Sequence, residues 1–297
     1  MPATTTAFDQ DLKIDHEFVG RHAKWLIDHG CTGIVTPGSL GESATLTLEE
    51  KLSLWSTVVA ATGDRVPVVA AIASLSTAEA VALARRAEDL GCSGLMVLPP
   101  YVYCGDWREM KTHVEAIFRA TKLSCMLYNN PVAYGTDFLP EQIKELTLEH
   151  ENFSAVKESS TDVRRVTWIR ELTGDRLAIF VGVDDAIVEG IAAGAVGWIA
   201  GLVNALPKES VDLFNYAMNG EREKAVPLYN WFLPLLRLDT VPKFVQLIKL
   251  VQQEVGMGNA RVRPPRLELS GPELQNALTT IRHALNNRPI PANPAQS

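Results

Sequence analysis

The chain has 297 residues, of which 46% are hydrophobic and 21% are charged, and this composition is typical of a globular protein that can bury a sizeable core. The 28 Lys and Arg residues and the 35 Asp and Glu residues give a formal charge of −7 without any basic block, which excludes nucleic acids and anionic membranes as expected partners. No stretch approaches the roughly 18 consecutive apolar residues of a spanning helix, and the N-terminus lacks the basic start of an export signal. We therefore expect a cytoplasmic protein whose 4 cysteines are free thiols.

Short apolar runs recur along the chain and predict its strands. The first strand is expected in the opening "MPATTT", and because Met1 lies almost inside it, a natural start further upstream stays open. The later runs are apolar throughout rather than alternating, which is typical of parallel strands that helices cover on both faces. They span residues 32–37, 66–72, 94–99, 123–129, 153–159, 177–183 and 197–201.

Helical patterns separate these runs. The segment with Ala80, Leu83 and Ala84 carries its apolar residues on one helical face, and Thr47-x-x-Glu50 is the spelling of a capping box at a helix start. Eight strand–helix units in succession favour an α/β fold of the closed (β/α)8 TIM barrel type over an open doubly wound sheet. No dinucleotide-binding or phosphate-loop spelling supports the open sheet.

The strand pattern ends at about residue 220, and only helical patterns follow it. They cover residues 221–235 and 240–255, and a further helix is expected to begin at a capping box from Ser270 to Glu273. The expected organisation is therefore a barrel over residues 1–220, followed by a small C-terminal helical region over residues 221–297.

Polar residues at the ends of the predicted strands are the candidates for chemistry, because barrel enzymes carry their active sites at the carboxyl ends of the strands. Lys157 in "FSAVKESS" is the foremost candidate, since lysine is rarely buried and this position is expected to point into the barrel. A desolvated lysine has a lowered pKa, and its neutral amine can attack a carbonyl to form a Schiff base. An ion pair with Glu158 is the alternative. The other candidates are Ser39, Tyr101, Tyr103, Tyr128, Asn129, Ser159, Asp184 and Asp185.

Tyr128 ends the preceding strand, "LSCMLYN", and suits a role as proton donor and acceptor beside the lysine. Ser39 and Tyr101 are the candidate hydroxyls that would connect Tyr128 to a proton relay, and the alternative is that its phenol only packs with the hydroxyl on a backbone carbonyl. The loop from Gly38 to Glu42 contains glycines that allow backbone N–H groups to converge on a substrate carboxylate, although such glycines also form ordinary turns.

Other chemistries find no support in the sequence. The 6 histidines show neither an H-x-x-x-H spacing nor a mixed His/Cys ligand spacing, so no metal site is expected. The G-x-S-x-G elbow of a serine hydrolase is also missing.

Several ordered motifs resemble those of one known family. The stretches "GSLGESATLTLEEK", "GLMVLPPYVY", "LYNNPVAYG", "AVKESS", "VGVDDA" and "GWIAGLVNALP" are similar in order and spacing to the dihydrodipicolinate synthase / N-acetylneuraminate lyase family of class I aldolases, over essentially the whole chain. The resemblance implies a (β/α)8 barrel that assembles as a homotetramer, a dimer of tight dimers. It further implies that Lys157 forms a Schiff base with pyruvate or another 2-keto acid, without a cofactor, because the lysine itself is the electron sink.

The resemblance also implies roles for individual residues. Tyr128 matches the general acid/base of the family. Ser39 and Tyr101 match the hydroxyls that complete the proton relay, and the tyrosine is typically inserted from the neighbouring subunit. The backbone N–H groups of Ser39 and Leu40 would hold the carboxylate of the keto acid. Further substrate contacts are expected at Ser159, Ile199 and Gly201, and Asn130 and Tyr134 are expected to shape the distal pocket.

Departures from the family pattern bear on the second substrate. Ala133 stands where dihydrodipicolinate synthases usually carry an arginine that binds the carboxylate of the aldehyde substrate, and Leu40 stands where they usually carry threonine. The missing guanidinium removes a charge-assisted pair worth about 2–3 kcal/mol. By contrast, Asp184 and Asp185 resemble the acidic pair with which sugar-acid lyases of the family hold substrate hydroxyls, and capping of the following helix is their alternative role.

The sequence therefore predicts a lyase that cleaves a hydroxylated 2-keto acid to pyruvate and an aldehyde, or that dehydrates a 2-keto-3-deoxy sugar acid through the same imine. Condensation of pyruvate with aspartate semialdehyde is the alternative reaction. A barrel that binds keto acids without turnover and a phosphate-binding isomerase are the alternatives from other classes. The Lys157–Tyr128 pair argues against the first, and the lack of a basic residue beside the glycines of "GWIAGLVNALP" argues against the second.

Overall fold

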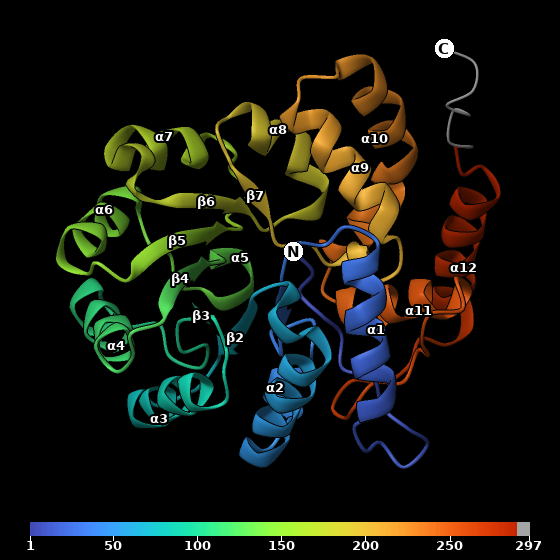
Figure 1. Ribbon diagram of the computed structural model, residues 1–297. Helices are drawn as coiled ribbons and strands as arrows, with labels where there is room; N and C mark the ends of the chain where they lie inside the picture. Colours follow the sequence, from blue (N-terminus) through green and yellow to red (C-terminus); the bar gives the residue numbers. More distant parts are fainter. Residues whose placement is uncertain (290–297) are drawn as a thin grey trace.

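The computed structural model describes residues 1–289 and is built around a curled sheet of parallel strands with helices on its outer side (Figure 1). The strands are hydrogen-bonded in chain order, so each strand lies beside the one that follows it. Their bounds are Ile34–Thr36 (β1), Val68–Ile72 (β2), Gly94–Val97 (β3), Ser124–Asn129 (β4), Phe153–Glu158 (β5), Ala178–Val181 (β6) and Gly197–Trp198 (β7).

The opening segment of the chain closes this sheet into a barrel. Pro2 pairs in parallel with Ala200, just beyond β7, and Ala3 pairs with Val35 of β1. The N–H of Ala3 donates to the carbonyl of Ala200 over 2.9 Å, and the N–H of Val35 donates to the carbonyl of Pro2 over 2.9 Å. The strand predicted in "MPATTT" is thus reduced to two bridges. It nevertheless fills the eighth position, and the predicted (β/α)8 barrel is confirmed.

Helices connect successive strands and surround the sheet (Figure 1). The capping box predicted at Thr47 is confirmed, since its hydroxyl accepts from the N–H of Glu50 and the Glu50 carboxylate returns a bond to the Thr47 N–H. Within residues 1–289, no helix is both long and apolar enough to cross a membrane. The bounds are His16–Asp28 (α1), Leu48–Thr62 (α2), Thr77–Asp89 (α3), Trp107–Arg119 (α4), Pro131–Tyr134 (α5), Pro140–Glu149 (α6), Arg164–Thr173 (α7), Ile187–Ala192 (α8) and Pro207–Met218 (α9).

Three helices follow the barrel, at Arg222–Leu236 (α10), Phe244–Glu254 (α11) and Gly271–Asn286 (α12). The helix predicted from residue 240 begins at Phe244, because Pro242 lacks an N–H and restricts the residue before it. The capping box predicted at Ser270 does not form, since the Glu273 carboxylate pairs instead with Lys243 at 2.5 Å. The predicted C-terminal region includes residues 290–297, which lie outside the described residues, and its boundary at residue 220 stays a prediction.

Alternate residues along each strand face either the barrel interior or the surrounding helices. In β4, Tyr128 belongs to the interior cluster of apolar side chains, whereas Leu127 lies in the larger core between the sheet and the helices. β5 alternates in the same way, with Ala155 inside and Val156 outside. Because Lys157 lies two residues after Ala155, its side chain points into the barrel at the carboxyl end of the strand.

A buried ion pair attaches the C-terminal helices to the barrel. Lys249 in α11 lies 2.5 Å from Glu42, and the two side chains are 2% and 0% exposed. Lys249 also donates to the carbonyl of Arg261 over 2.6 Å, and the second carboxylate oxygen of Glu42 accepts from the N–H of Arg263 over 3.0 Å. Glu42 ends the loop that begins at Gly38, so the pair fixes this loop against α11.

Replacement of Lys249 by Met should lower the free energy of unfolding by about 3–5 kcal/mol, because it leaves the Glu42 carboxylate buried without its cation. Urea denaturation followed by circular dichroism measures the change. The double variant Glu42→Gln with Lys249→Met removes both charges and should recover much of the loss. A Lys249→Met protein as stable as the parent would show that the pair does not hold the loop.

Candidate active site

Tyr128 and Lys157 stand side by side at the carboxyl ends of β4 and β5. The two residues are partners in the parallel register of these strands, and the Nζ atom of Lys157 lies 4.0 Å from the centre of the Tyr128 ring. Each residue is only 6% exposed. The register of two adjacent strands therefore places an amine beside a phenol in one enclosed space, as nucleophilic catalysis assisted by proton transfer requires.

The Lys157 amine is desolvated and has no direct counter-ion. Within residues 1–289 its Nζ atom takes part in no hydrogen bond or ion pair, and it lies over the Tyr128 ring. Burial lowers the pKa of Lys157 to about 8. The carboxylates of Asp239 and Asp184 oppose this shift, because they favour the charged amine. About a tenth of the amine is therefore a neutral nucleophile at pH 7, far more than for an ordinary lysine.

Gly182, directly after β6, provides the space for the Lys157 side chain. A Cβ atom at this position would lie 2.6 Å from Cε of Lys157 and 2.0 Å from Oγ of Ser159. Ser159, a predicted substrate contact, has a buried hydroxyl that makes no hydrogen bond of ordinary geometry among the described residues, although it lies close enough to the Tyr128 phenol to lower the pKa of that tyrosine. Glu158, the alternative partner of Lys157, faces the other side of β5, where it accepts from Asn129 over 3.0 Å.

The phenol of Tyr128 is held in its neutral form. Burial raises the pKa of Tyr128 to about 12, and a hydrogen bond from the Asn130 amide only partly opposes this effect. That amide donates to the phenol oxygen over 3.0 Å. Tyr128 therefore enters a reaction as a proton donor, with its oxygen already oriented by Asn130.

Ser39 and Tyr134 form a hydroxyl pair beside this phenol. Their hydroxyls are in hydrogen-bond contact, and the Tyr134 ring packs edge-on against Tyr128 with the ring centres 5.8 Å apart. The predicted relay residue Tyr101 has its ring centre 6.2 Å from that of Tyr134, and its hydroxyl makes no hydrogen bond within the described part of the chain. The structure thus connects Ser39 to Tyr134, a residue predicted only to shape the pocket.

The loop after β1 offers two free backbone donors. The loop is closed by bonds from the N–H of Glu42 to the Ser39 carbonyl over 3.1 Å and from the N–H of Ser43 to the Gly38 carbonyl over 3.2 Å. The N–H groups of Ser39 and Leu40 have no acceptor among residues 1–289, so they are available to an anion. The Leu40 side chain packs into the core between the sheet and the helices, which leaves only its backbone for a ligand.

Asp184 is fully buried and holds the segment that follows β7. Its carboxylate accepts from the Trp198 indole over 3.0 Å and from the backbone N–H groups of Gly201 and Leu202 over 3.1 and 2.8 Å. Burial raises the pKa of Asp184 to about 6, and the hydrogen bonds from Leu202 and Gly201 oppose the rise. Both oxygens are used within the protein, and no helix cap is formed, so the structure gives Asp184 a positioning role that the sequence did not predict.

The end of β7 brings together predicted residues and one that the sequence did not reveal. Ile199 lies in the interior cluster, and a Cβ atom on Gly201 would lie 2.1 Å from Oδ1 of Asp239. Asp239 ends the 3₁₀ turn Arg237–Asp239 after α10. A single acid in "RLDTVPK" gives no signal of a site, because only the fold brings it to the barrel. The predicted contact Asp185 lies 3.6 Å from the Arg237 guanidinium.

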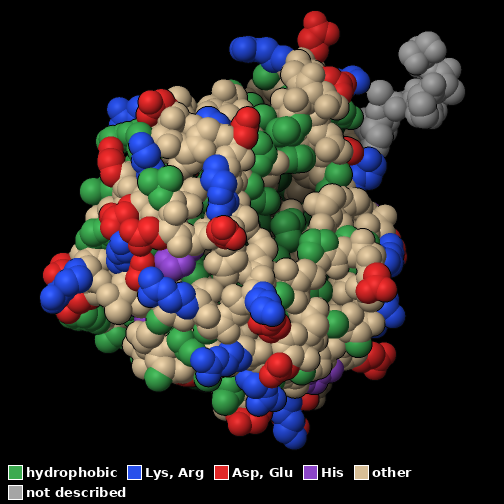
Figure 2. All heavy atoms as spheres, turned by 60° about the vertical axis from the view of Figure 1, so that its left-hand side comes forward, with side chains coloured by type: hydrophobic (Ala, Val, Ile, Leu, Met, Phe, Trp, Pro, Cys, Tyr) green, Lys and Arg blue, Asp and Glu red, His purple; other side chains and the backbone are tan. Residues whose placement is uncertain are grey.

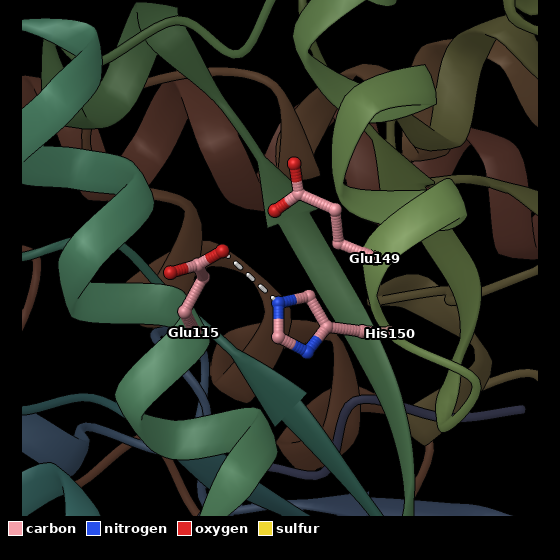
Figure 3. Close-up of side chains that lie close together, drawn as sticks. All are labelled: Glu115, Glu149 and His150. Atoms are coloured by element: carbon pink, nitrogen blue, oxygen red, sulfur yellow. Dashed lines mark hydrogen bonds and ion pairs between the residues drawn. The ribbon is translucent and has the colours of Figure 1, made fainter.

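Among the described residues, Glu115, Glu149 and His150 lie close enough together to hold a metal ion (Figure 3). His150 contacts Glu115 over 3.2 Å. The Lys111 ammonium, however, lies 2.7 Å from Glu149 and 3.8 Å from Glu115, and the Arg119 guanidinium lies 3.1 Å from Glu115, so both carboxylates already have cationic partners. The cluster lies on α4 and at the end of α6, just before β5 begins, and is thus at the opposite end of the barrel from Lys157. Acidic and basic side chains are interspersed over the surface in Figure 2.

Comparisons with known proteins agree on one family. The profile of the Dihydrodipicolinate synthetase family matches residues 1–284. The chain is 32% identical over 269 residues to a 4-hydroxy-tetrahydrodipicolinate synthase of Caldicellulosiruptor saccharolyticus. The aligned region covers 90% of this chain and 89% of that protein. It is 30% identical to a protein of the same name from Methanococcus maripaludis, over 94% of this chain and 97% of that one. A solved dihydrodipicolinate synthase of Bacillus anthracis superposes with a TM-score of 0.91 at 30% identity and covers 97% of both chains.

Lys157 should react with a small acylating reagent at a lower pH than ordinary lysines do. Given a pKa of about 8, its labelling rate should rise about tenfold per pH unit and level off above that value. Competitive labelling with acetic anhydride, read by peptide mass spectrometry, measures the profile. Lys224 is the internal control, because its hydrogen bond with Glu221 raises its pKa. Coincident profiles of the two lysines would contradict the desolvated amine.

Proposed function

The chain belongs to the dihydrodipicolinate synthetase family, and we propose that this lyase forms a Schiff base between Lys157 and pyruvate or a related 2-keto acid. One observation carries the proposal: a buried amine without a counter-ion lies 4.0 Å from the ring of a buried tyrosine at the ends of neighbouring strands. The family resemblance predicted from the motifs is confirmed by the match over residues 1–284.

Imine formation begins when the neutral amine of Lys157 attacks the keto carbon. The C–N bond forms as the carbonyl electron pair moves to oxygen, and one amine proton is transferred to that oxygen. Tyr128 then protonates the resulting hydroxyl, which leaves as water while the nitrogen lone pair forms the C=N bond. The iminium keeps one N–H and a positive charge, and Tyr128 is left as the phenolate.

The same phenolate can take a proton in the next step. In aldol cleavage it removes the proton of the C4 hydroxyl, the O–H electron pair forms the aldehyde carbonyl, and the C3–C4 pair moves toward the iminium nitrogen to give an enamine. In dehydration, loss of a C3 proton gives the enamine, and the C4 hydroxyl leaves as water. In both cases the iminium accepts the electron pair. After cleavage, Tyr128 gives its newly gained proton to C3 of the enamine, and in dehydration it gives that proton to the departing C4 hydroxyl, so an imine results in both cases. Hydrolysis of this imine frees Lys157.

The position of the imine on Lys157 suggests roles for the other residues of the site. The carboxylate of the keto acid would lie on the free N–H groups of Ser39 and Leu40, with the Ser39–Tyr134 hydroxyl pair beside Tyr128. Ser159, with its unpartnered buried hydroxyl, would contact the bound acid directly. For Asp184 we propose that it shapes the wall at Gly201 through its hydrogen bonds, instead of holding substrate hydroxyls itself.

Condensation of pyruvate with aspartate semialdehyde is the second candidate, because it is the reaction of the curated relatives by name. The loop that would bind the carboxylate of the aldehyde disfavours it. Ala133 lies exposed in α5 and uses its N–H to bond the Asn130 side chain over 3.0 Å, so position 133 offers no guanidinium. We therefore place cleavage or dehydration of a hydroxylated 2-keto acid first.

Incubation with pyruvate followed by sodium borohydride should attach one reduced pyruvyl group, located on Lys157 by peptide mass spectrometry. Lys157→Ala should abolish the adduct. Tyr128→Phe should still form it slowly, whereas turnover should fall about 10²- to 10⁴-fold, since general acid–base catalysis is lost. Turnover is then compared between aspartate semialdehyde with pyruvate and a set of 2-keto-3-deoxy sugar acids.

The outcomes separate the candidates. Turnover of a sugar acid without condensation supports the proposal, and efficient condensation would replace it by the second candidate. Absence of an adduct with pyruvate and with every longer keto acid would contradict the Schiff-base mechanism and favour a barrel without turnover.

We also propose that the protein assembles as a homotetramer, a dimer of dimers, as is typical of the family. Val102 and Val132 are 76% and 72% exposed, and the segments that carry them contact each other, since the Cys104 thiol bonds the carbonyl of Tyr134 over 3.5 Å; we propose that both valines belong to one contact patch beside the site. A second copy on this patch would bring in its Tyr101.

Sedimentation velocity should give the mass of a tetramer for the parent. Val102→Asp with Val132→Asp should give a smaller species, while Leu148→Asp, at another position that is 77% exposed, should keep the parent mass. A monomeric parent would contradict the assembly.

A cytoplasmic location, proposed because Cys31, Cys92, Cys104 and Cys125 are all free thiols, is tested by cell fractionation.

A further inference from the structure

Asp239 comes from the C-terminal helical region, yet its carboxylate lies inside the mouth of the barrel. Ile199, directly after β7, faces the interior, and Gly201 lies two residues later, where the following 3₁₀ turn begins. A Cβ atom on Gly201 would be 2.1 Å from Oδ1 and 2.6 Å from Oδ2 of Asp239. The carboxylate thus occupies the place that a side chain at position 201 would fill.

Lys157 is accommodated in the same way one strand away. Gly182 follows the inward-facing Phe180 by two residues, and a Cβ atom on Gly182 would collide with the Lys157 side chain. β6 and β7 are hydrogen-bonded neighbours. Two glycines at the ends of adjacent strands therefore create adjacent spaces, one filled by Lys157 and the other by Asp239.

Asp239 is half-buried, and no group of the described chain pairs with its buried oxygen. Oδ1 of Asp239 is buried without a hydrogen-bond partner, and within residues 1–289 Asp239 has no ion pair, since the adjacent Arg237 pairs with Asp185. Burial and the charge of Asp184 raise the pKa of Asp239, while Lys157 opposes the rise. Buried polar groups are normally satisfied, so this oxygen is set to receive a donor from outside the chain.

We propose that Asp239 accepts a hydrogen bond from the distal part of the substrate and so selects 2-keto acids that carry hydroxyl or protonated amino groups over those that carry a second carboxylate. This selectivity rests on the proposed function, because a keto acid bound to Lys157 is what extends toward Asp239. A second carboxylate has no proton to donate to Oδ1 of Asp239 and would add negative charge beside Asp184, and Ala133 provides no compensating cation.

Three 2-keto acids serve as probes: pyruvate without a distal group, 2-keto-3-deoxygluconate with hydroxyls, and 2-ketoglutarate with a second carboxylate. Each is titrated against the full chain and the Asp239→Asn variant, and the imine is trapped with borohydride and quantified by intact mass. The parent should reach half-saturation with the hydroxylated probe at a concentration at least about tenfold lower than with 2-ketoglutarate. Asp239→Asn should shrink this ratio about tenfold, chiefly through better binding of 2-ketoglutarate, and leave pyruvate within about twofold.

Two controls separate recognition from a general effect. Asp175→Asn removes an exposed acid that pairs with Arg170 at 3.0 Å before β6 begins, and it should leave all three titrations unchanged. The melting temperature of Asp239→Asn should stay at or above that of the parent, because the replaced carboxyl makes no hydrogen bond or ion pair within residues 1–289, so a changed ratio would not come from misfolding. An unchanged ratio in Asp239→Asn would overturn the assignment of Asp239 alone. Absence of adducts with every probe in the parent would overturn the proposed function, and this inference with it.

Discussion

Closure of the sheet is the constraint on which the site depends. In a closed barrel the inward-facing residues of all strands share one narrow interior, and the register of β4 and β5 puts Tyr128 opposite Lys157. Water is excluded from both side chains together. The same desolvation lowers the pKa of the amine and raises that of the phenol, so a single physical cause suits the two groups to their proposed roles as nucleophile and proton donor.

Local patterns in the sequence predicted the elements whose determinants are themselves local. The apolar runs located β2 to β6, and Thr47 located the start of α2. The errors arose where distant residues decide the structure. The opening segment is held only by its neighbours in the barrel, and the Glu273 carboxylate bonds Lys243 rather than its own helix. No short window of sequence contains such partners.

The same division holds within the site. Strand position was enough to predict that Lys157 and Tyr128 lie on neighbouring strands, because the parallel register follows from the succession of strands. The roles of Asp184 and Asp239 depend instead on contacts across the fold. Asp184 accepts from donors at the end of β7, and Asp239 reaches the barrel from the turn after α10. The sequence predicted Asp184 as a substrate contact and gave no signal for Asp239.

Because Asp239 lies so close to Gly201, the residue that is tolerated at one of these positions depends on the residue at the other. A chain that acquires a side chain at position 201 cannot keep an acid at position 239 in its present place, since the new Cβ atom would lie within 2.6 Å of all three atoms of the carboxyl group. Among relatives, the two positions should therefore vary together even though they lie in different structural regions. A chimera that combines the barrel of one member with the C-terminal helices of another would take its proposed substrate selectivity from the member that supplied the helices. This holds only if the residue at position 201 leaves room for the residue at position 239.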